Sequence, residues 1–127
     1  MTTAQRIYLD NAATTPMAEE VIDVMIPMMR EHYGNPSSTH AHGRKVRGII
    51  EEARGTVAKL LNCTPGEIFF TSGGTEADNL ALRGSVAKLG IQNIISSAIE
   101  HHAVLHTVEE LHHQQGVGLD FVKLDAQ

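Results

Sequence analysis

The chain has 127 residues, of which 42% are hydrophobic and 20% charged, proportions typical of a single globular domain. Its formal net charge of −5 argues against nucleic-acid binding, and no apolar run approaches the length of a membrane span. One cysteine excludes an internal disulfide and favours a reducing, cytoplasmic location.

Short apolar runs alternate along the chain with longer stretches in which apolar residues recur every three or four positions. This alternation of strand and helix is typical of an α/β fold with a mainly parallel sheet. Pro27 is expected to kink or split the first helix, and Ser38 or Thr39 is expected to cap the second. The predicted strands are residues 7–9, 68–70, 91–97 and 119–124, and the predicted helices are residues 17–33, 40–62, 75–89 and 100–115.

Residues 67–82, EIFFTSGGTEADNLAL, combine a predicted strand, a glycine turn and a helix start. In that order the unpaired N–H groups of the first helical turn converge on one point, where the helix dipole adds partial positive charge. The segment therefore predicts an anion site, most simply for phosphate. Its spacing matches neither GxGxxG nor GxxxxGK[ST], which leaves a small phosphate such as that of a cofactor. The alternative is a plain tight turn at Gly73 and Gly74, with Thr75 as the helix cap.

Helical periodicity assigns the histidines of the last predicted helix to different faces. Steps of three and four from His101 reach apolar residues, so His101 is expected on the buried stripe, near the strand ends where α/β sheets bind ligands. An imidazole there stacks on a flat cofactor or transfers a proton, and a histidine capped by backbone at the helix start is the open alternative. The stripe consists of Val104, Leu105, Val108 and Leu111, and the histidines expected to face water are His102, His106 and His113.

A metal site is another interpretation of this helix. His102 and His106 are four residues apart, and Glu109 or Glu110 would be the third zinc ligand. The HExxH spacing and a cysteine pair are absent, so a solvated polar face is favoured and no metal is expected. Cys63 follows a helix C-terminus, whose field does not activate a thiol, and is expected to be a small buried residue.

Four motifs together resemble the N-terminal portion of the cysteine desulfurases, pyridoxal-phosphate enzymes of the class V aminotransferase group. With the helices between them they span nearly the whole chain, and their common order is more specific than any single motif. The resemblance implies the large domain of a fold-type I enzyme. The motifs are YLDNAATTP (residues 8–16), GNPSSTHAHG (34–43), EIFFTSGGTEADNLAL (67–82) and SSAIEHHAVL (96–105).

The resemblance implies roles that spacing alone does not give. Gly74 and Thr75 match the pair that contacts the cofactor phosphate. His101 matches the histidine that stacks on the pyridine ring and assists proton transfer. The residues that match loops at the substrate end of the site are Ala13, Thr14 and Asn35.

The implied reaction converts L-cysteine to L-alanine and passes the sulfur to an enzyme cysteine as a persulfide, for iron–sulfur cluster or thio-cofactor synthesis. The implied cofactor is pyridoxal 5′-phosphate, and the implied partners are a sulfur-acceptor protein and the second subunit of a homodimer. A related class V aminotransferase, a selenocysteine lyase, and a non-catalytic binding or assembly module are the alternatives.

The sequence also departs from the family pattern. Family members are much longer, and their Schiff-base lysine follows a Ser-x-His context that is absent here. Cys63 does not match the persulfide-forming cysteine. Residues 1–127 are therefore expected to be an N-terminal segment and part of the cofactor-binding large domain, without the rest of that domain and the small C-terminal domain. By itself the chain is expected to be inactive and either to self-associate or to be weakly stable. Its lysines are Lys45, Lys59, Lys88 and Lys123.

Overall fold

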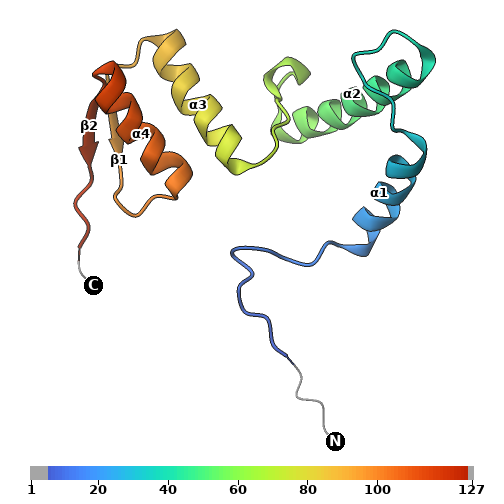
Figure 1. The fold of residues 1–127 in the computed structure, drawn as a ribbon, viewed down its shortest axis with the longest axis horizontal. Coiled ribbons are helices and arrows are strands. Elements are labelled where there is room, and N and C mark those ends of the chain that lie inside the picture. The colour runs from blue at the N-terminus through green and yellow to red at the C-terminus, as the bar shows by residue number, and fades with distance from the viewer. Residues whose placement is uncertain (1–5, 126–127) are drawn as a thin grey trace, which may run out of the picture. The chain divides into compact units, whose positions relative to one another are not determined.

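The computed structural model of the protein describes residues 6–125, which form two compact units, one ending at Ile68 and the other beginning at Phe69 (Figure 1). Helices and a parallel pair of strands give the chain the predicted α/β character. Within residues 6–125 no helix is both long and apolar enough to cross a bilayer. The first unit contains α1 (Glu19–Glu31), α2 (Ala41–Leu61) and the short 3-10 helix η1 (Pro65–Glu67), and the second contains α3 (Gly74–Leu89), β1 (Asn93–Ser96), α4 (His102–Gln115) and β2 (Gly118–Phe121).

α1 is one continuous helix although it contains Pro27, so of the two predicted effects of this residue the split does not occur, and the kink stays a prediction. Proline lacks the N–H that would bond to the carbonyl of Asp23, four residues earlier. Both residues are exposed, and water can therefore serve that carbonyl. No α1 side chain is buried within the described part of the chain.

α2 has the predicted position but a different cap. The Nδ1 of His40 accepts a hydrogen bond from the Gly43 N–H at 3.3 Å, so the cap is His40 and not Ser38 or Thr39. Gly43 is buried because the preceding loop folds onto it. A Cβ at this position would lie 2.6 Å from the carbonyl oxygen of Asn35 and would also collide with Ser38.

The apolar runs at residues 7–9 and 68–70 are not strands in the structure, which corrects two predictions. A strand exists only where a neighbour accepts and donates its backbone hydrogen bonds, and between residues 6 and 125 the only paired strands are β1 and β2. The local preference is nevertheless visible. Ile68 has extended angles, with φ −99° and ψ 123°.

In the second unit, β1 and β2 run parallel, with Ile94 opposite Leu119. α4 connects the two strands and packs against both, as the predicted strand–helix–strand unit requires. Val108 and Leu111 of α4 are each only 1% exposed and form the centre of this unit. α3 packs along α4, so the two helices lie side by side (Figure 1).

Candidate functional site

The start of α3 opens onto free space. The helix begins at Gly74 and its N-cap is Gly73, so Thr75 is the second helical residue and not the cap. The N–H groups of the first helical turn have no intrahelical carbonyl partner. A Cβ added at Gly73 or Gly74 would meet no atom within 4 Å, and Thr75 is exposed. A ligand can therefore approach the backbone here.

Glu76 is bound back to the turn that precedes the helix. Its Oε2 accepts hydrogen bonds from the N–H of Ser72 at 2.6 Å and from the Ser72 hydroxyl at 2.7 Å. Both bonds favour the charged carboxylate and lower the pKa of Glu76, the backbone bond contributing most. Because the Ser72 N–H is already used, an anion would be bound by the unpaired N–H groups of the first helical turn, among them those of Gly74 and Thr75.

His101 is the N-cap of α4 and is exposed, so its predicted place on the buried stripe is wrong. The cap has extended backbone angles, with φ −58° and ψ 144°, and the helical periodicity therefore does not extend to it. Its Nδ1 accepts a hydrogen bond from the Ala103 N–H at 3.1 Å. This is the alternative given above, in which the histidine bonds to the backbone at the helix start. In the neutral ring the proton must then reside on Nε2, which leaves that N–H free to donate.

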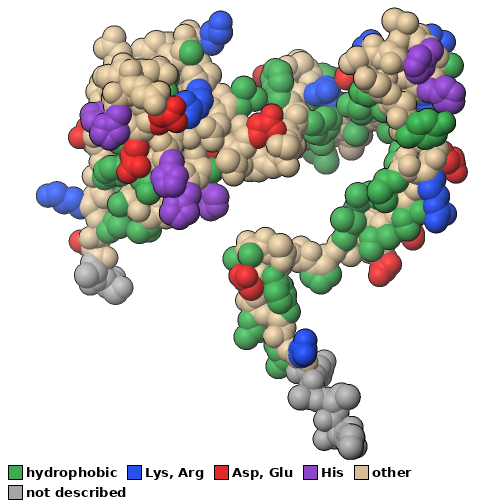
Figure 2. All heavy atoms as spheres, in the orientation of Figure 1, with side chains coloured by type: hydrophobic (Ala, Val, Ile, Leu, Met, Phe, Trp, Pro, Cys, Tyr) green, Lys and Arg blue, Asp and Glu red, His purple; other side chains and the backbone are tan. Residues whose placement is uncertain are grey.

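Thr75 and His101 line one surface groove of about 340 Å³ between α3 and α4. His102 and His106 are exposed, as predicted, and belong to the same groove. Figure 2 shows histidine side chains gathered over α4 on the face in view. The other residues of the groove are Asn79, Arg83, Ala103, Thr107 and Glu110.

A polar network that the sequence reasoning missed forms the floor of this groove. Asn79 Oδ1 accepts hydrogen bonds from the Thr107 hydroxyl at 2.9 Å and from Arg83 Nε at 3.1 Å. Arg83 also forms a two-bond ion pair with Glu110, at 3.2 and 2.6 Å, which lowers the pKa of the Glu110 carboxyl. The sequence contained one signal for this network. Thr107 is four residues after Ala103 and four before Leu111, so a hydroxyl on the buried side of α4 was predictable.

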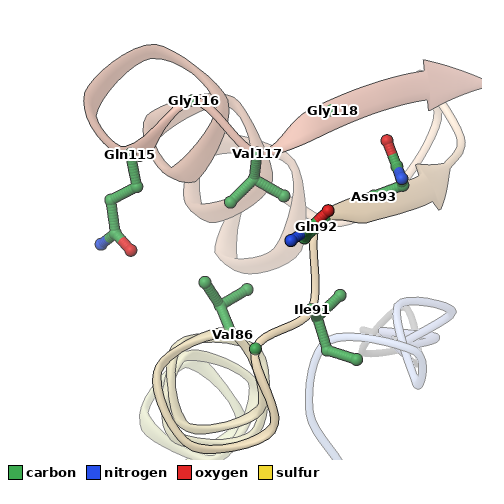
Figure 3. A pocket seen from close by; sticks show the side chains of 9 residues that line it. Val86, Ile91, Gln92, Asn93, Gln115, Gly116, Val117 and Gly118 are labelled. Atoms are coloured by element: carbon green, nitrogen blue, oxygen red, sulfur yellow. The ribbon is translucent and has the colours of Figure 1, made fainter.

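A second pocket, of about 570 Å³, lies where α3 and α4 end and β1 and β2 begin (Figure 3). None of its lining residues is titratable, and none is a predicted site residue. It therefore offers amide groups and apolar side chains but no acid–base group. Its lining consists of Val86, Gly90, Ile91, Gln92, Asn93, Gln115, Gly116, Val117 and Gly118.

Three of the predicted site residues belong to the first unit. The N–H groups of Ala13 and Thr14 donate to the Asp10 carbonyl at 3.1 and 3.3 Å, which closes an exposed turn. Asn35 Oδ1 accepts a hydrogen bond from the Ser37 N–H at 2.8 Å. In the structure each of the three therefore has a local role in a turn.

Two further expectations concern metal and thiol chemistry. The rings of His102 and His106 have centroids 5.0 Å apart, but no group of three potential metal ligands occurs among residues 6–125. Cys63 is half-buried, so the expectation of a small buried residue is met only in part.

Comparison with known proteins places these observations in a family. Residues 7–127 match the class-V aminotransferase family. A protein of Dictyoglomus turgidum named cysteine desulfurase IscS is 48% identical over 112 residues, which cover 84% of this chain and 28% of that protein. The chain spans about a third of the length of the curated relatives that it matches, which agrees with the expectation of a partial sequence.

Solved structures give the same result. A NifS-like protein is 41% identical, with a TM-score of 0.85, and the match covers 95% of this chain and 34% of that chain. A second structure, SspA in complex with cysteine, is 36% identical, with a TM-score of 0.74, over 91% of this chain and 33% of that one. These likenesses confirm the resemblance to cysteine desulfurases and the truncated fold-type I architecture.

Proposed function

This chain belongs to the class-V aminotransferase family, and from that premise we propose that it forms part of the pyridoxal-phosphate site of a cysteine desulfurase. Gly74 and Thr75 would hold the cofactor phosphate, and His101 would face the ring. The cofactor supplies an electron sink for the chemistry of the substrate. L-cysteine is the proposed substrate, since a similar structure contains cysteine.

The residues present fit two parts of this cofactor. Free space in front of Gly73 and Gly74 and the unpaired N–H groups of the first α3 turn suit a phosphate. The exposed imidazole of His101 suits a flat ring. None of the four lysines lines the groove, so these residues fit the phosphate and the ring but not covalent attachment.

His101 is suited to acid–base work because one ring nitrogen is already engaged. With Nδ1 accepting from the Ala103 N–H, the neutral ring presents its proton on Nε2. That N–H can donate to a group in the groove, and a proton can leave from the same atom. Thr75 contributes a hydroxyl donor and an N–H at the positive end of the helix dipole.

The observation that carries the proposal is that Thr75 and His101 line the same groove although they lie 26 positions apart in the sequence. Residues 1–127 would contribute the N-terminal segment and part of the large domain of the enzyme. A sulfur-acceptor protein, a homodimeric partner and a cytoplasmic location belong to the same proposal. Ala13, Thr14 and Asn35 are proposed to line the substrate end.

Phosphate recognition is tested directly with the 127-residue chain. Phosphorus NMR follows pyridoxal phosphate as the protein is added, and proton NMR of the pyridine ring follows pyridoxal, which lacks the phosphate, as the comparison ligand. We expect binding of pyridoxal phosphate alone, and Thr75→Val should weaken it about fivefold, the value of one hydrogen bond. Thr56→Val is the matched control, because among the described residues the Thr56 hydroxyl bonds only to the Glu52 carbonyl within α2.

Activity is tested in a chimera in which the aligned residues of this chain replace those of the Dictyoglomus turgidum relative. Alanine and sulfide released from L-cysteine are measured in the presence of a thiol reductant. We expect the chimera to be active. A chimera that folds and retains the cofactor absorbance but releases neither product would contradict the proposal, as would equal binding of pyridoxal and pyridoxal phosphate.

A further inference from the structure

We propose that Asn79 and Thr107 are positioning residues that hold the starts of α3 and α4 at the spacing required to bind a phosphorylated aromatic cofactor. The inference rests on the proposed function, in which Thr75 binds the phosphate and His101 faces the ring. Neither Asn79 nor Thr107 has to touch the ligand for this role. Their effect passes through the two helix starts.

The side-chain amide of Asn79 has one possible orientation. Arg83 Nε can only donate, so it selects Oδ1, which lies 3.1 Å away. The Thr75 carbonyl can only accept, so it selects Nδ2, which lies 2.9 Å away. Asn79 is thereby bonded on one side to the residue that is proposed to bind phosphate.

The other side of Asn79 reaches α4. Its Oδ1 accepts from the Thr107 hydroxyl at 2.9 Å, and its Nδ2 lies 3.5 Å from the Ala103 carbonyl. The Thr107 hydroxyl also lies 2.8 Å from the same Ala103 carbonyl, so its single proton is shared between two acceptors. Thr107 is only 3% exposed, and water therefore cannot replace these bonds when one partner is removed.

Ala103 completes the connection to His101. Its carbonyl belongs to the network, and its N–H donates to Nδ1 of the His101 ring at 3.1 Å. A continuous series of hydrogen bonds thus runs from the Thr75 carbonyl through Asn79 and Ala103 to the His101 imidazole. The positions of these groups are important because small displacements of groups around a ligand greatly reduce the affinity or the reaction rate.

The chain provides a control in the same interface. Glu110 bonds to Arg83 across α3 and α4, and both side chains are 40% exposed. Glu110→Ala removes this ion pair, and we expect the Arg83 Nε bond to Asn79 to remain, because it does not involve Glu110. It therefore weakens helix–helix packing without breaking the series that joins Thr75 to His101.

The experiment compares Thr107→Val, Thr107→Ser and Glu110→Ala in the 127-residue chain. Affinity for pyridoxal phosphate is measured by phosphorus NMR, and the His101 tautomer is measured from the nitrogen chemical shifts of its ring without ligand. Thr107→Val should weaken binding about fivefold and mix the two tautomers, and Thr107→Ser should restore affinity to within about twofold. Glu110→Ala should leave the His101 tautomer at its wild-type value, even if its melting temperature falls as far as that of Thr107→Val. Asn79→Asp, which keeps the shape but replaces the donor with an acceptor, repeats the test if Thr107→Val does not fold.

The outcomes separate this inference from the proposed function. If wild type binds and Thr75→Val weakens binding, but neither Thr107→Val nor Asn79→Asp changes the affinity or the tautomer, the positioning role is overturned and the proposed function stands. If Glu110→Ala mixes the His101 tautomers as Thr107→Val does, general loss of packing explains the result and the positioning role is again overturned. If wild type does not bind pyridoxal phosphate at all, both fail.

Discussion

His101 combines two roles in one side chain, since it caps α4 and also lines the groove. His101→Ala removes both, whereas His101→Asn keeps a capping oxygen and removes only the imidazole. We expect the alanine variant to destabilise the chain by about 1 kcal/mol and the asparagine variant by a few tenths. In the chimera, both should lose most of the desulfurase turnover. Urea unfolding and alanine release are the two measurements.

His102→Ala is the control for this pair, because His102 is also exposed and lines the same groove. Its turnover should remain near that of the parent chimera. An asparagine variant at position 101 that keeps full turnover would show that the imidazole is not needed. Equal losses at positions 101 and 102 would show that neither histidine has a specific role.

Glu76 should make the stability of the second unit depend on acid pH. Its pKa in the folded chain is lowered from the usual 4.5 by the N–H and hydroxyl of Ser72. A group with a depressed folded pKa contributes stability above its unfolded pKa, and the contribution is lost as pH falls through the folded value. Glu76→Gln should therefore be less stable than wild type at pH 7, and the difference should shrink below pH 4.5.

The measurement is urea unfolding at a series of pH values. Asp78→Asn is the matched control, since Asp78 lies in the same helix and makes no hydrogen bond with the described residues outside the helix. The effect of Asp78→Asn on the unfolding free energy should not shrink at acid pH as the effect of Glu76→Gln does. A Glu76→Gln difference that stays constant from pH 7 to pH 3 would exclude the bond to Ser72 as its cause.

At the scale of elements, two glycines of α2 make a sharp comparison. A Cβ at Gly43 would collide with backbone oxygens of the preceding loop, whereas a Cβ at Gly48 would meet nothing within 4 Å. Gly43→Ala should destabilise the first unit by about 1–3 kcal/mol through overpacking. Gly48→Ala should stabilise it by about 0.5–1 kcal/mol, because alanine is the better helix former. Circular dichroism during urea unfolding measures both, and equal effects would contradict the packing of this loop.

The helices were predictable from the sequence because their hydrogen bonds are local. α2 and α4 lie where the apolar periodicity places them, and Gly90 ends α3 with φ 67°, as a glycine C-cap predicts. Strands need a partner, so the apolar residues at 7–9 and 68–70 were assigned to strands that the structure does not form. Local preference alone does not reveal whether a partner is present.

The candidate site was predictable only in part. The start of a helix after Gly73 follows from the glycine turn, and the side of α4 that carries Val108 and Leu111 follows from periodicity. The phosphate-binding role of Gly74 and Thr75 was implied by the resemblance and stays a prediction. The link through Asn79 depends on how α3 packs on α4, which no spacing within one helix determines. The exposure of His101 was missed because a cap residue lies outside the helical repeat.

For the whole molecule, the division into two units separates the predicted site residues into two groups. Thr75 and His101 belong to the unit that begins at Phe69, and Ala13, Thr14 and Asn35 belong to the unit that ends at Ile68. The groove, its histidines and the polar network are therefore all contained in the second unit. Cofactor recognition and substrate recognition can accordingly be tested by separate sets of variants.

Exposed apolar side chains predict that the 127-residue chain associates with itself. Ile95 of β1 is 74% exposed, whereas its neighbour Ile94 is partly covered, and single strand pairs leave open edges for pairing.

Light scattering should show a mean mass that rises with protein concentration. Ile95→Thr should reduce this rise while changing stability by less than about 0.5 kcal/mol, because threonine suits a strand and the position is exposed. Leu111→Ala, at a position only 1% exposed, should instead cost about 2–5 kcal/mol. A monodisperse monomer with a cooperative melt at every concentration would contradict the prediction, since it would show that these side chains do not drive association.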